Sequence, residues 1–254
     1  RFMNGFAQDI IVGNNFTINS NAVFDVDVAG IAVTNSLSLN GNITNNGTLN
    51  FDAGSGRVCN LTFKGNSNKS FTGINGAAST TLNLLTIDKG SSQTPTLTLD
   101  VAGALTTPSN NWLTLANGTF NVAKAATLTL TNAALTSYTI PSTAALTVNN
   151  AGATINIGMF ADDNNDLFLG GKLEITAGTV NIGAAANNNN NDIEYVAAST
   201  PLINLTGGNL NINGQIRRST TVTTGFLSYS QSGTSAVLIR GRNHNPIRAK
   251  LEIV

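Results

Sequence analysis

The sequence has little of what many catalytic sites are built from. Its 254 residues include one cysteine and one histidine, and only 10% of them are charged, compared with about 25% in an average soluble domain. Cys59 has no partner for an internal disulfide, and His244 has no second histidine with which to form a histidine-based zinc site. No run of about 18 apolar residues occurs, so we predict no membrane-spanning helix.

The formal net charge is zero, so the chain as a whole carries no field that would draw it to nucleic acid or to an anionic membrane. We therefore expect neither nucleic-acid binding nor membrane insertion. The chain starts without a signal peptide and stops inside an apparent strand, 249–254. We interpret residues 1–254 as a single segment of a longer polypeptide, whose other domains are its first expected partners.

What the chain does have is 38 asparagines, 33 threonines and 25 glycines, together with 41% hydrophobic residues in short alternating runs. Asparagine, threonine and glycine are poor helix formers, and no segment sustains an apolar period of 3.6 residues. Alternation with a period of two is typical of strands that bury one face. The composition therefore predicts an all-β protein.

A four-residue motif, threonine or asparagine followed by an apolar residue, asparagine and another apolar residue, recurs along the chain. Its spacing varies, which indicates repeated coils with loops of different length. Four copies directly follow a glycine, which predicts a turn with positive φ before the strand. The copies are Thr48–Phe51, Thr81–Leu84, Thr119–Val122, Thr154–Ile157, Thr179–Ile182 and Asn209–Ile212.

Strands this short bury too little surface alone, so the coils must stack on one another. We predict a right-handed parallel β-helix, a β-solenoid with irregular coil lengths and loop insertions; an antiparallel sandwich is the alternative. Asparagines at equivalent places on successive coils are expected to form amide ladders. The second residues of the six motif copies are expected to form one stacked core row: Leu49, Leu82, Phe120, Ile155, Val180 and Leu210.

Several segments resemble the β-helical repeats of large secreted and cell-surface proteins of Bacteroidetes: Leu61–Gly73, Thr81–Gly90, Leu97–Asp100 and Leu113–Val122. The resemblance implies export by the type IX secretion system and a place on the bacterial cell surface or in the extracellular space, often as an adhesin. It also implies surface glycans or the secretion machinery as partners. The resemblance is one of pattern and transfers no functional residue.

Two acidic groups are candidates for chemistry. Asp25 and Asp27 alternate on one strand and so point to one side of it, as a pair of glycosidase carboxylates could. Asp162, Asp163 and Asp166 offer oxygen ligands within one loop and are our candidate calcium site. Apart from this calcium, we expect no cofactor. The asparagine run 187–191 has no apolar neighbours and is predicted to be a loop.

The leading functional hypothesis is a structural or adhesive stalk or spacer segment without catalytic activity. The second is a carbohydrate-active β-helix enzyme, such as a polysaccharide lyase or hydrolase, which clustering of acids across coils would favour. The third is a surface-binding threonine array for ice or a crystalline polysaccharide, which aligned outward threonine rows would favour. The candidate rows are Thr94, Thr96 and Thr98, and Thr127, Thr129 and Thr131.

Overall fold

A computed structural model describes the chain at residues 6–26, 31–132, 136–159, 165–184, 191–196, 198–219, 225–240, 247–248 and 251–253. These residues contain strands and turns and no helix, and hence no helix that is long and apolar enough to cross a membrane. Contacts divide the chain into two compact units: unit 1 comprises 1–108 and 112–118, and unit 2 comprises 109–111 and 119–254.

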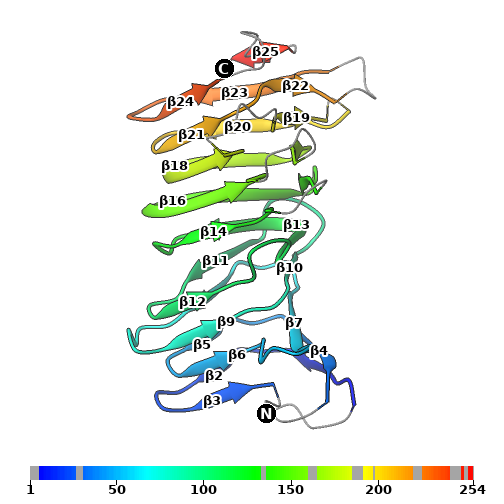
Figure 1. The fold of residues 1–254 in the computed structure, drawn as a ribbon, viewed down its shortest axis with the longest axis vertical. Helices are drawn as coiled ribbons and strands as arrows, with labels where there is room; N and C mark the ends of the chain where they lie inside the picture. Colours follow the sequence, from blue (N-terminus) through cyan, green and yellow to red (C-terminus); the bar gives the residue numbers. More distant parts are fainter. Residues whose placement is uncertain are drawn as a thin grey trace. The chain divides into compact units, whose positions relative to one another are not determined.

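Unit 1 is a stack of coils in which each coil contributes three strands (Figure 1). All strand pairs of its three ladders are parallel. The first ladder consists of β1 (Asp9–Val12), β4 (Val33–Leu39), β7 (Arg57–Phe63), β10 (Leu85–Asp88) and β13 (Leu113–Val122, which continues into unit 2). The second consists of β2 (Phe16–Ile18), β5 (Ile43–Asn45), β8 (Lys69–Thr72) and β11 (Thr96–Asp100). The third consists of β3 (Val23–Asp25), β6 (Thr48–Asn50), β9 (Ser79–Thr81) and β12 (Ala104–Thr106).

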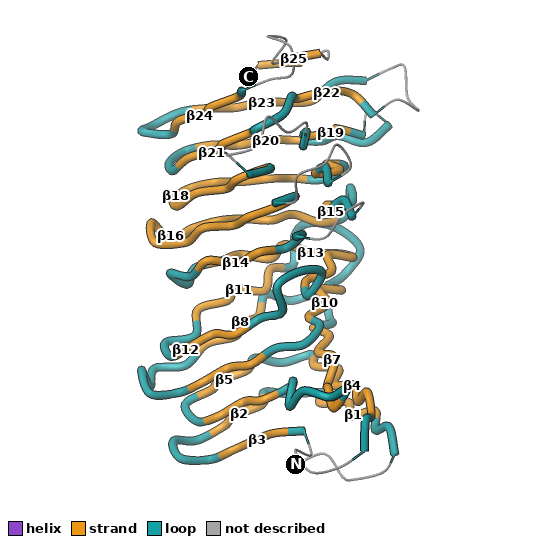
Figure 2. The backbone as a smooth tube through the Cα atoms, viewed as in Figure 1, coloured by secondary structure: helices purple, strands orange, loops and turns teal. Residues whose placement is uncertain are grey.

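Unit 2 is also a stack of coils made of strands joined by turns and loops (Figure 2). Its long strands β16 (Ala144–Ile157) and β18 (Lys172–Ile182) belong to two ladders at once. One ladder continues through β20 (Leu202–Leu205), β23 (Leu227–Gln231) and β26 (Leu251–Ile253), and the other contains β14 (Thr127–Thr129), β21 (Asn209–Ile212) and β24 (Ala236–Ile239). The third ladder is β15 (Tyr138–Ile140), β17 (Leu167–Leu169), β19 (Ile193–Tyr195), β22 (Ile216–Arg218) and β25 (Ile247–Arg248).

The core is made of apolar rows that run from coil to coil. In unit 1, Leu37, Leu61 and Leu85 are aligned on neighbouring strands and fully or almost fully buried. Each such side chain contributes about 1.5–3 kcal/mol when it leaves water. Along Cys59–Phe63 of β7, buried residues alternate with partly exposed ones, so the apolar side chains face the core and the polar ones face outward. The all-β parallel solenoid predicted from the alternation is therefore confirmed, while its right-handed sense stays a prediction.

Coil length varies, as the motif spacing predicted. In-register asparagines are 25 residues apart at Asn156 and Asn181, but 30 apart at Asn181 and Asn211. Between β16 and β18 part of the difference is taken up by register shifts after Val148 and after Asn149, whereas β18 and β21 pair without a shift.

The prediction of one stacked core row is correct for burial and wrong for register. All six side chains are 0–1% exposed. Ile155, Val180 and Leu210 are aligned on β16, β18 and β21. In unit 1, however, Leu49 is aligned with Thr80, so the second motif copy is two residues out of phase. Because side chains alternate with a period of two, a shift of two residues keeps Leu82 inside but moves it to another row.

The glycines before the motif have two different roles. Gly118, Gly178 and Gly208 have φ values of +89°, +84° and +70°, which confirms the predicted positive φ. Gly208 directly precedes β21 as predicted, whereas Gly118 and Gly178 lie within β13 and β18, so the predicted turn before the strand is wrong there. Gly47 does not have a positive φ. A Cβ at Gly47 would lie 2.2 Å from the carbonyl oxygen of Ala22, so this glycine is required because two coils approach closely.

Candidate functional site

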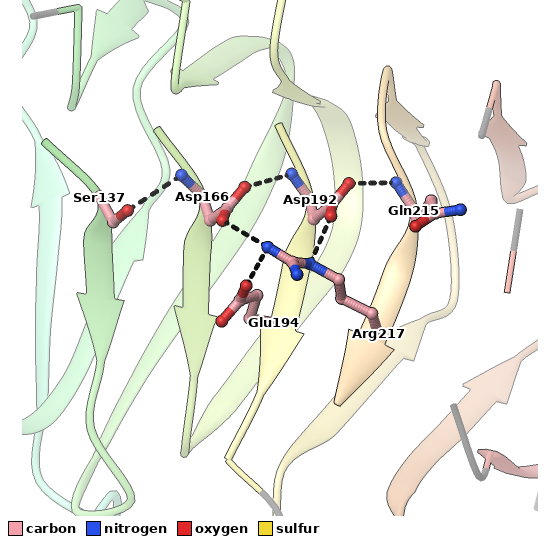
Figure 3. A network of polar contacts seen from close by, with 6 residues as sticks. All are labelled: Ser137, Asp166, Asp192, Glu194, Gln215 and Arg217. Atoms are coloured by element: carbon pink, nitrogen blue, oxygen red, sulfur yellow. Dashed lines mark hydrogen bonds and ion pairs between the residues drawn. The ribbon is translucent and has the colours of Figure 1, made fainter. Parts of the chain in front are cut away.

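A cluster of three acids and one arginine lies on the third ladder of unit 2 (Figure 3). Asp166 and Asp192 directly precede β17 and β19, where the register pairs Leu167 with Ile193. The two aspartates therefore occupy equivalent places on successive coils. Glu194 is the middle residue of β19 and is aligned with Arg217 of β22. Stacking alone brings together residues that are up to 51 positions apart in the sequence.

The aspartates connect the coils through the backbone. The Asp166 amide N–H donates to Oγ of Ser137 at 3.1 Å. Oδ1 of Asp166 accepts from the Asp192 amide at 2.7 Å, and Oδ1 of Asp192 accepts from the Gln215 amide at 2.6 Å. Each of these side chains thus accepts a hydrogen bond from the backbone amide of the equivalent residue on the next coil, directly before the strand begins.

Other carboxylate oxygens of the cluster converge on Arg217. Its Nη2 lies 3.2 Å from Oδ2 of Asp166, and its Nε lies 2.5 Å from Oδ2 of Asp192. Nη2 also contacts Oε1 of Glu194. The side chains of Asp166, Asp192 and Glu194 are 5%, 3% and 9% exposed, whereas that of Arg217 is 30% exposed. One guanidinium therefore compensates three buried carboxyl groups.

The imbalance between acids and arginine affects protonation. Burial raises the pKa of Asp166 from 3.8 to about 6, and Glu194 adds to this rise; the hydrogen bond from Asp192 and the Arg217 charge oppose it. Burial also raises the pKa of Glu194, against the effect of Arg217 and with that of Asp192. The cluster therefore takes up a proton near pH 6.

A carboxyl group with a raised pKa is the type of group that acts as a general acid in glycoside hydrolysis. Here, however, both oxygens of Asp166 are engaged by the protein and its side chain is almost wholly buried. A polysaccharide chain cannot reach these oxygens without opening the coils. The arrangement suits a pH-sensitive structural network that fastens successive coils.

The structure describes only part of the predicted site residues. In the calcium candidate, Asp162 and Asp163 lie outside the described residues, and Asp166 is the member of the cluster above. Within the described ranges, no group of three or more histidine, cysteine, aspartate or glutamate side chains is placed to hold a metal ion. The calcium site stays a prediction.

Of the acidic pair Asp25 and Asp27 and the sole histidine, the structure describes only Asp25. Asp25 lies on β3 and is partly exposed, while Asp27 and His244 lie outside the described residues. Cys59 is fully buried in β7, and burial raises the pKa of its thiol to about 12. A thiol with a raised pKa forms little of the thiolate that makes a cysteine reactive.

Of the two predicted threonine rows, Thr94, Thr96 and Thr98 are exposed or partly exposed and alternate with buried residues, as predicted, whereas the second row is not as predicted. Thr127 is exposed, but Thr131 is fully buried, so the three threonines of this second row do not form one outward row.

Of the asparagine run predicted to be a loop, residues 187–190 lie outside the described residues, and Asn191 lies outside the strands as predicted. It is nevertheless buried, and its Nδ2 donates to the carbonyl of Gly158. An amide without apolar neighbours can still be buried where a carbonyl accepts from it.

Sequence reasoning missed the acid–arginine cluster and a second buried charge, Lys89. The Lys89 side chain is fully buried, and its Nζ donates to the carbonyl oxygen of Lys64 at 3.1 Å. The one available signal for the cluster was the spacing of 26 residues between Asp166 and Asp192, which is one coil length. Each acid directly precedes an apolar strand.

The fold and this cluster define the chain as a parallel β-solenoid with internal charge compensation. Comparisons with protein-family models, with curated proteins and with solved structures found no match.

Proposed function

We propose that this chain is a structural or adhesive spacer segment of a secreted or cell-surface bacterial protein and that it has no catalytic activity of its own. The observation that supports the proposal most is the register of the ladders. Within each unit, the strands of one coil pair in parallel with the equivalent strands of the next coil. The polar groups that connect the coils stabilise this stacking. Such a segment extends a polypeptide by whole coils.

The burial of the acidic cluster also supports the spacer over the enzyme. A lyase or hydrolase needs carboxyl groups that its polymer substrate can reach. Among the described residues, the acids brought together across coils are Asp166, Asp192 and Glu194, and they are turned inward against Arg217. The resemblance to Bacteroidetes repeats supports the extracellular location, with other domains of the same polypeptide and surface glycans as partners.

One observation favours the threonine array as a second candidate. Thr127, Thr154 and Thr179 are aligned on β14, β16 and β18 and point outward. The column then changes to Asn209 and Ala236 on the next two coils. A lysine at Thr154 would interrupt a flat array and abolish binding to an ordered surface, whereas it would leave a spacer unaffected.

The spacer proposal can be tested by removing one coil of unit 1. Deleting residues 48–78 joins Gly47 to Ser79, which is aligned with Thr48 in the intact chain. A spacer should still fold with a cooperative thermal transition, because the new neighbours have matching register. Deleting 48–70 instead breaks the register and should abolish the transition. Equal loss of folding in both variants would contradict the proposal.

The absence of catalysis is tested separately, by incubating the intact chain with neutral and acidic polysaccharides and measuring new reducing ends and unsaturated products. We expect neither. Cleavage that disappears in Asp25→Asn would assign the chain to the carbohydrate-active enzymes.

A further inference from the structure

Unit 2 has a small cavity where successive coils turn after the ladder of β16, β18, β21 and β24. Its volume is about 200 Å³, below the roughly 300–1,000 Å³ of sites for drug-sized ligands. This size suits a single sugar ring. It is lined by Met159, Asn181, Gly183, Asn211, Asn213 and Arg240.

The register explains why these residues meet. Asn181 and Asn211 are aligned on β18 and β21. Asn213 and Arg240 follow the ends of β21 and β24, and the Arg240 amide donates to the carbonyl of Ile212. Successive coils thus place polar side chains on the same side of the stack, near the ends of the strands of this ladder. The cavity is lined by two strand residues and by residues that follow strand ends.

Two of the lining residues belong to an asparagine ladder, which confirms the ladders predicted from the sequence. Nδ2 of Asn181 donates to Oδ1 of Asn156 at 2.9 Å, and Nδ2 of Asn211 donates to Oδ1 of Asn181 at 2.8 Å. Each ladder bond uses one of the two N–H groups of an amide and one of the two lone pairs of its oxygen. The amides of Asn181 and Asn211 therefore retain capacity both to donate and to accept.

Arg240 supplies a positive charge at the cavity. Asn213 is buried and fixed by donating Nδ2 to the carbonyl oxygens of Ile182 at 3.3 Å and Gly183 at 2.6 Å. Its Oδ1 contacts Nη1 of Arg240 and so holds the guanidinium in place. Within the described part of the chain, no carboxylate pairs with Arg240. The guanidinium has further N–H groups to offer to an anion.

We propose that this cavity binds an acidic sugar, a hexuronate unit of a polysaccharide. The carboxylate pairs with Arg240, hydroxyl groups bind the amides of Asn181 and Asn211, and Met159 contacts the apolar face of the ring. Hydroxyls both donate and accept, as the ladder amides do, whereas inorganic phosphate at neutral pH offers mainly acceptors. The inference deepens the adhesive part of the proposed function and rests on it. Because coil deletion and polysaccharide cleavage test the spacer separately, failure here would leave the spacer role intact.

The test is a titration of the intact chain, labelled with nitrogen-15, with a galacturonate trisaccharide and with its neutral galactose counterpart. We expect the galacturonate to shift the side-chain amide signals of Asn181 and Asn211 and to bind at least tenfold more tightly than the neutral sugar. Arg240→Gln should remove this preference and leave the melting temperature unchanged. Lys124→Gln removes a charge that does not line the cavity and should retain the preference.

Asn211→Ala provides a second test that depends on hydroxyl recognition. It should weaken galacturonate binding severalfold and leave binding of inorganic phosphate unchanged. Three results would overturn the proposal: equal binding of the acidic and neutral sugars, binding unaffected by Arg240→Gln, or phosphate binding as tight as that of galacturonate, which would indicate a nonspecific anion site.

Discussion

The two units bury charge in opposite ways. In unit 1, Lys89 is fully buried, and the acceptor that the structure shows for its ammonium group is the carbonyl of Lys64. In unit 2, Arg217 contacts three carboxyl groups, namely Asp166, Asp192 and Glu194. Unit 1 therefore has a buried cation held by a neutral acceptor, and unit 2 has an excess of buried acid around a partly exposed cation.

The pKa shifts reflect this difference. Burial lowers the pKa of Lys89, and the nearby charge of Lys69 lowers it further. In unit 2, burial raises the pKa of Asp166. In both cases the ionised form is disfavoured in the folded state, so at neutral pH each group costs stability. The comparison shows that a solenoid can tolerate charge inside a coil where the stacking supplies a polar partner.

The largest effect is expected where no such partner exists. Ile155 is fully buried in the core row of unit 2, so Ile155→Lys should destabilise that unit by more than about 4 kcal/mol and unfold neighbouring coils. Thr154→Lys places the same charge on the outward side of β16 and should change stability by less than about 1 kcal/mol. Chemical denaturation of both variants checks the difference. Similar losses would mean that Ile155 and Thr154 do not face opposite sides.

Arg217→Gln should have the second largest effect. It leaves three buried carboxyl groups without their cation, and loss of one partner of a buried ion pair costs about 3–5 kcal/mol. Arg218→Gln is the matched control, because Arg218 donates to Oη of Tyr195 and the carbonyl of Gly225, both at 3.3 Å. Its measured loss of unfolding free energy should be less than half as large. A larger loss for Arg218→Gln than for Arg217→Gln would contradict the claim that Arg217 stabilises unit 2 by compensating the three buried carboxyl groups.

The protonation of Asp166 should be visible as a pH dependence. Its folded-state pKa of about 6 is above its ordinary value of 3.8, so its stabilising contribution is complete below about pH 4 and is lost as the pH rises through 6. Asp166→Asn resembles the protonated form. Relative to the wild type, this variant should therefore gain about 2–3 kcal/mol of stability between pH 4 and pH 7.5. Chemical denaturation of both proteins at pH 4 and pH 7.5 measures this gain in unfolding free energy. The same difference between variant and wild type at both pH values would contradict the raised pKa of Asp166.

The smallest effect is expected for Lys89→Met. Methionine fills a similar volume without the desolvation cost of the ammonium group, but it leaves the carbonyl of Lys64 without this donor. Stability should stay the same or rise by about 1 kcal/mol. Lys64→Met, at a half-exposed side chain 4.0 Å from Asp88, should change it by less than about 0.5 kcal/mol. A loss above about 2 kcal/mol in Lys89→Met would show that the buried ammonium group stabilises unit 1.

The sequence predicted the features that depend on local alternation. Burial of Ile155, Val180 and Leu210 follows from the period of two, because every second residue of a half-buried strand faces the core. Positive φ at Gly208 follows from a turn directly before β21. These properties are fixed by a few neighbouring residues.

Register was harder to predict, because it depends on loop length. The shift of Leu82 by two residues keeps the side chain inside, so the alternation does not reveal it. The cluster was missed for the same reason: Asp166 and Arg217 are 51 residues apart, and they meet only when two coil lengths are known. Lys89 has no sequence signal, since a lysine after a strand is usually exposed.

The central claim is that successive coils stack in parallel with one fixed register. Thr62 and Thr86 are aligned on neighbouring strands of unit 1, and Thr114 is the next residue of that outward column. In a Cys59→Ala background, cysteines at 62 and 86 lie one strand spacing apart, about 4.8 Å, whereas cysteines at 62 and 114 lie about 9.6 Å apart. With a thiol cross-linker that spans only the shorter distance, the account predicts rapid intramolecular cross-linking of the 62–86 pair and none of the 62–114 pair, as measured by mass spectrometry. Equal cross-linking of both pairs, or cross-linking of the 62–114 pair alone, would contradict it.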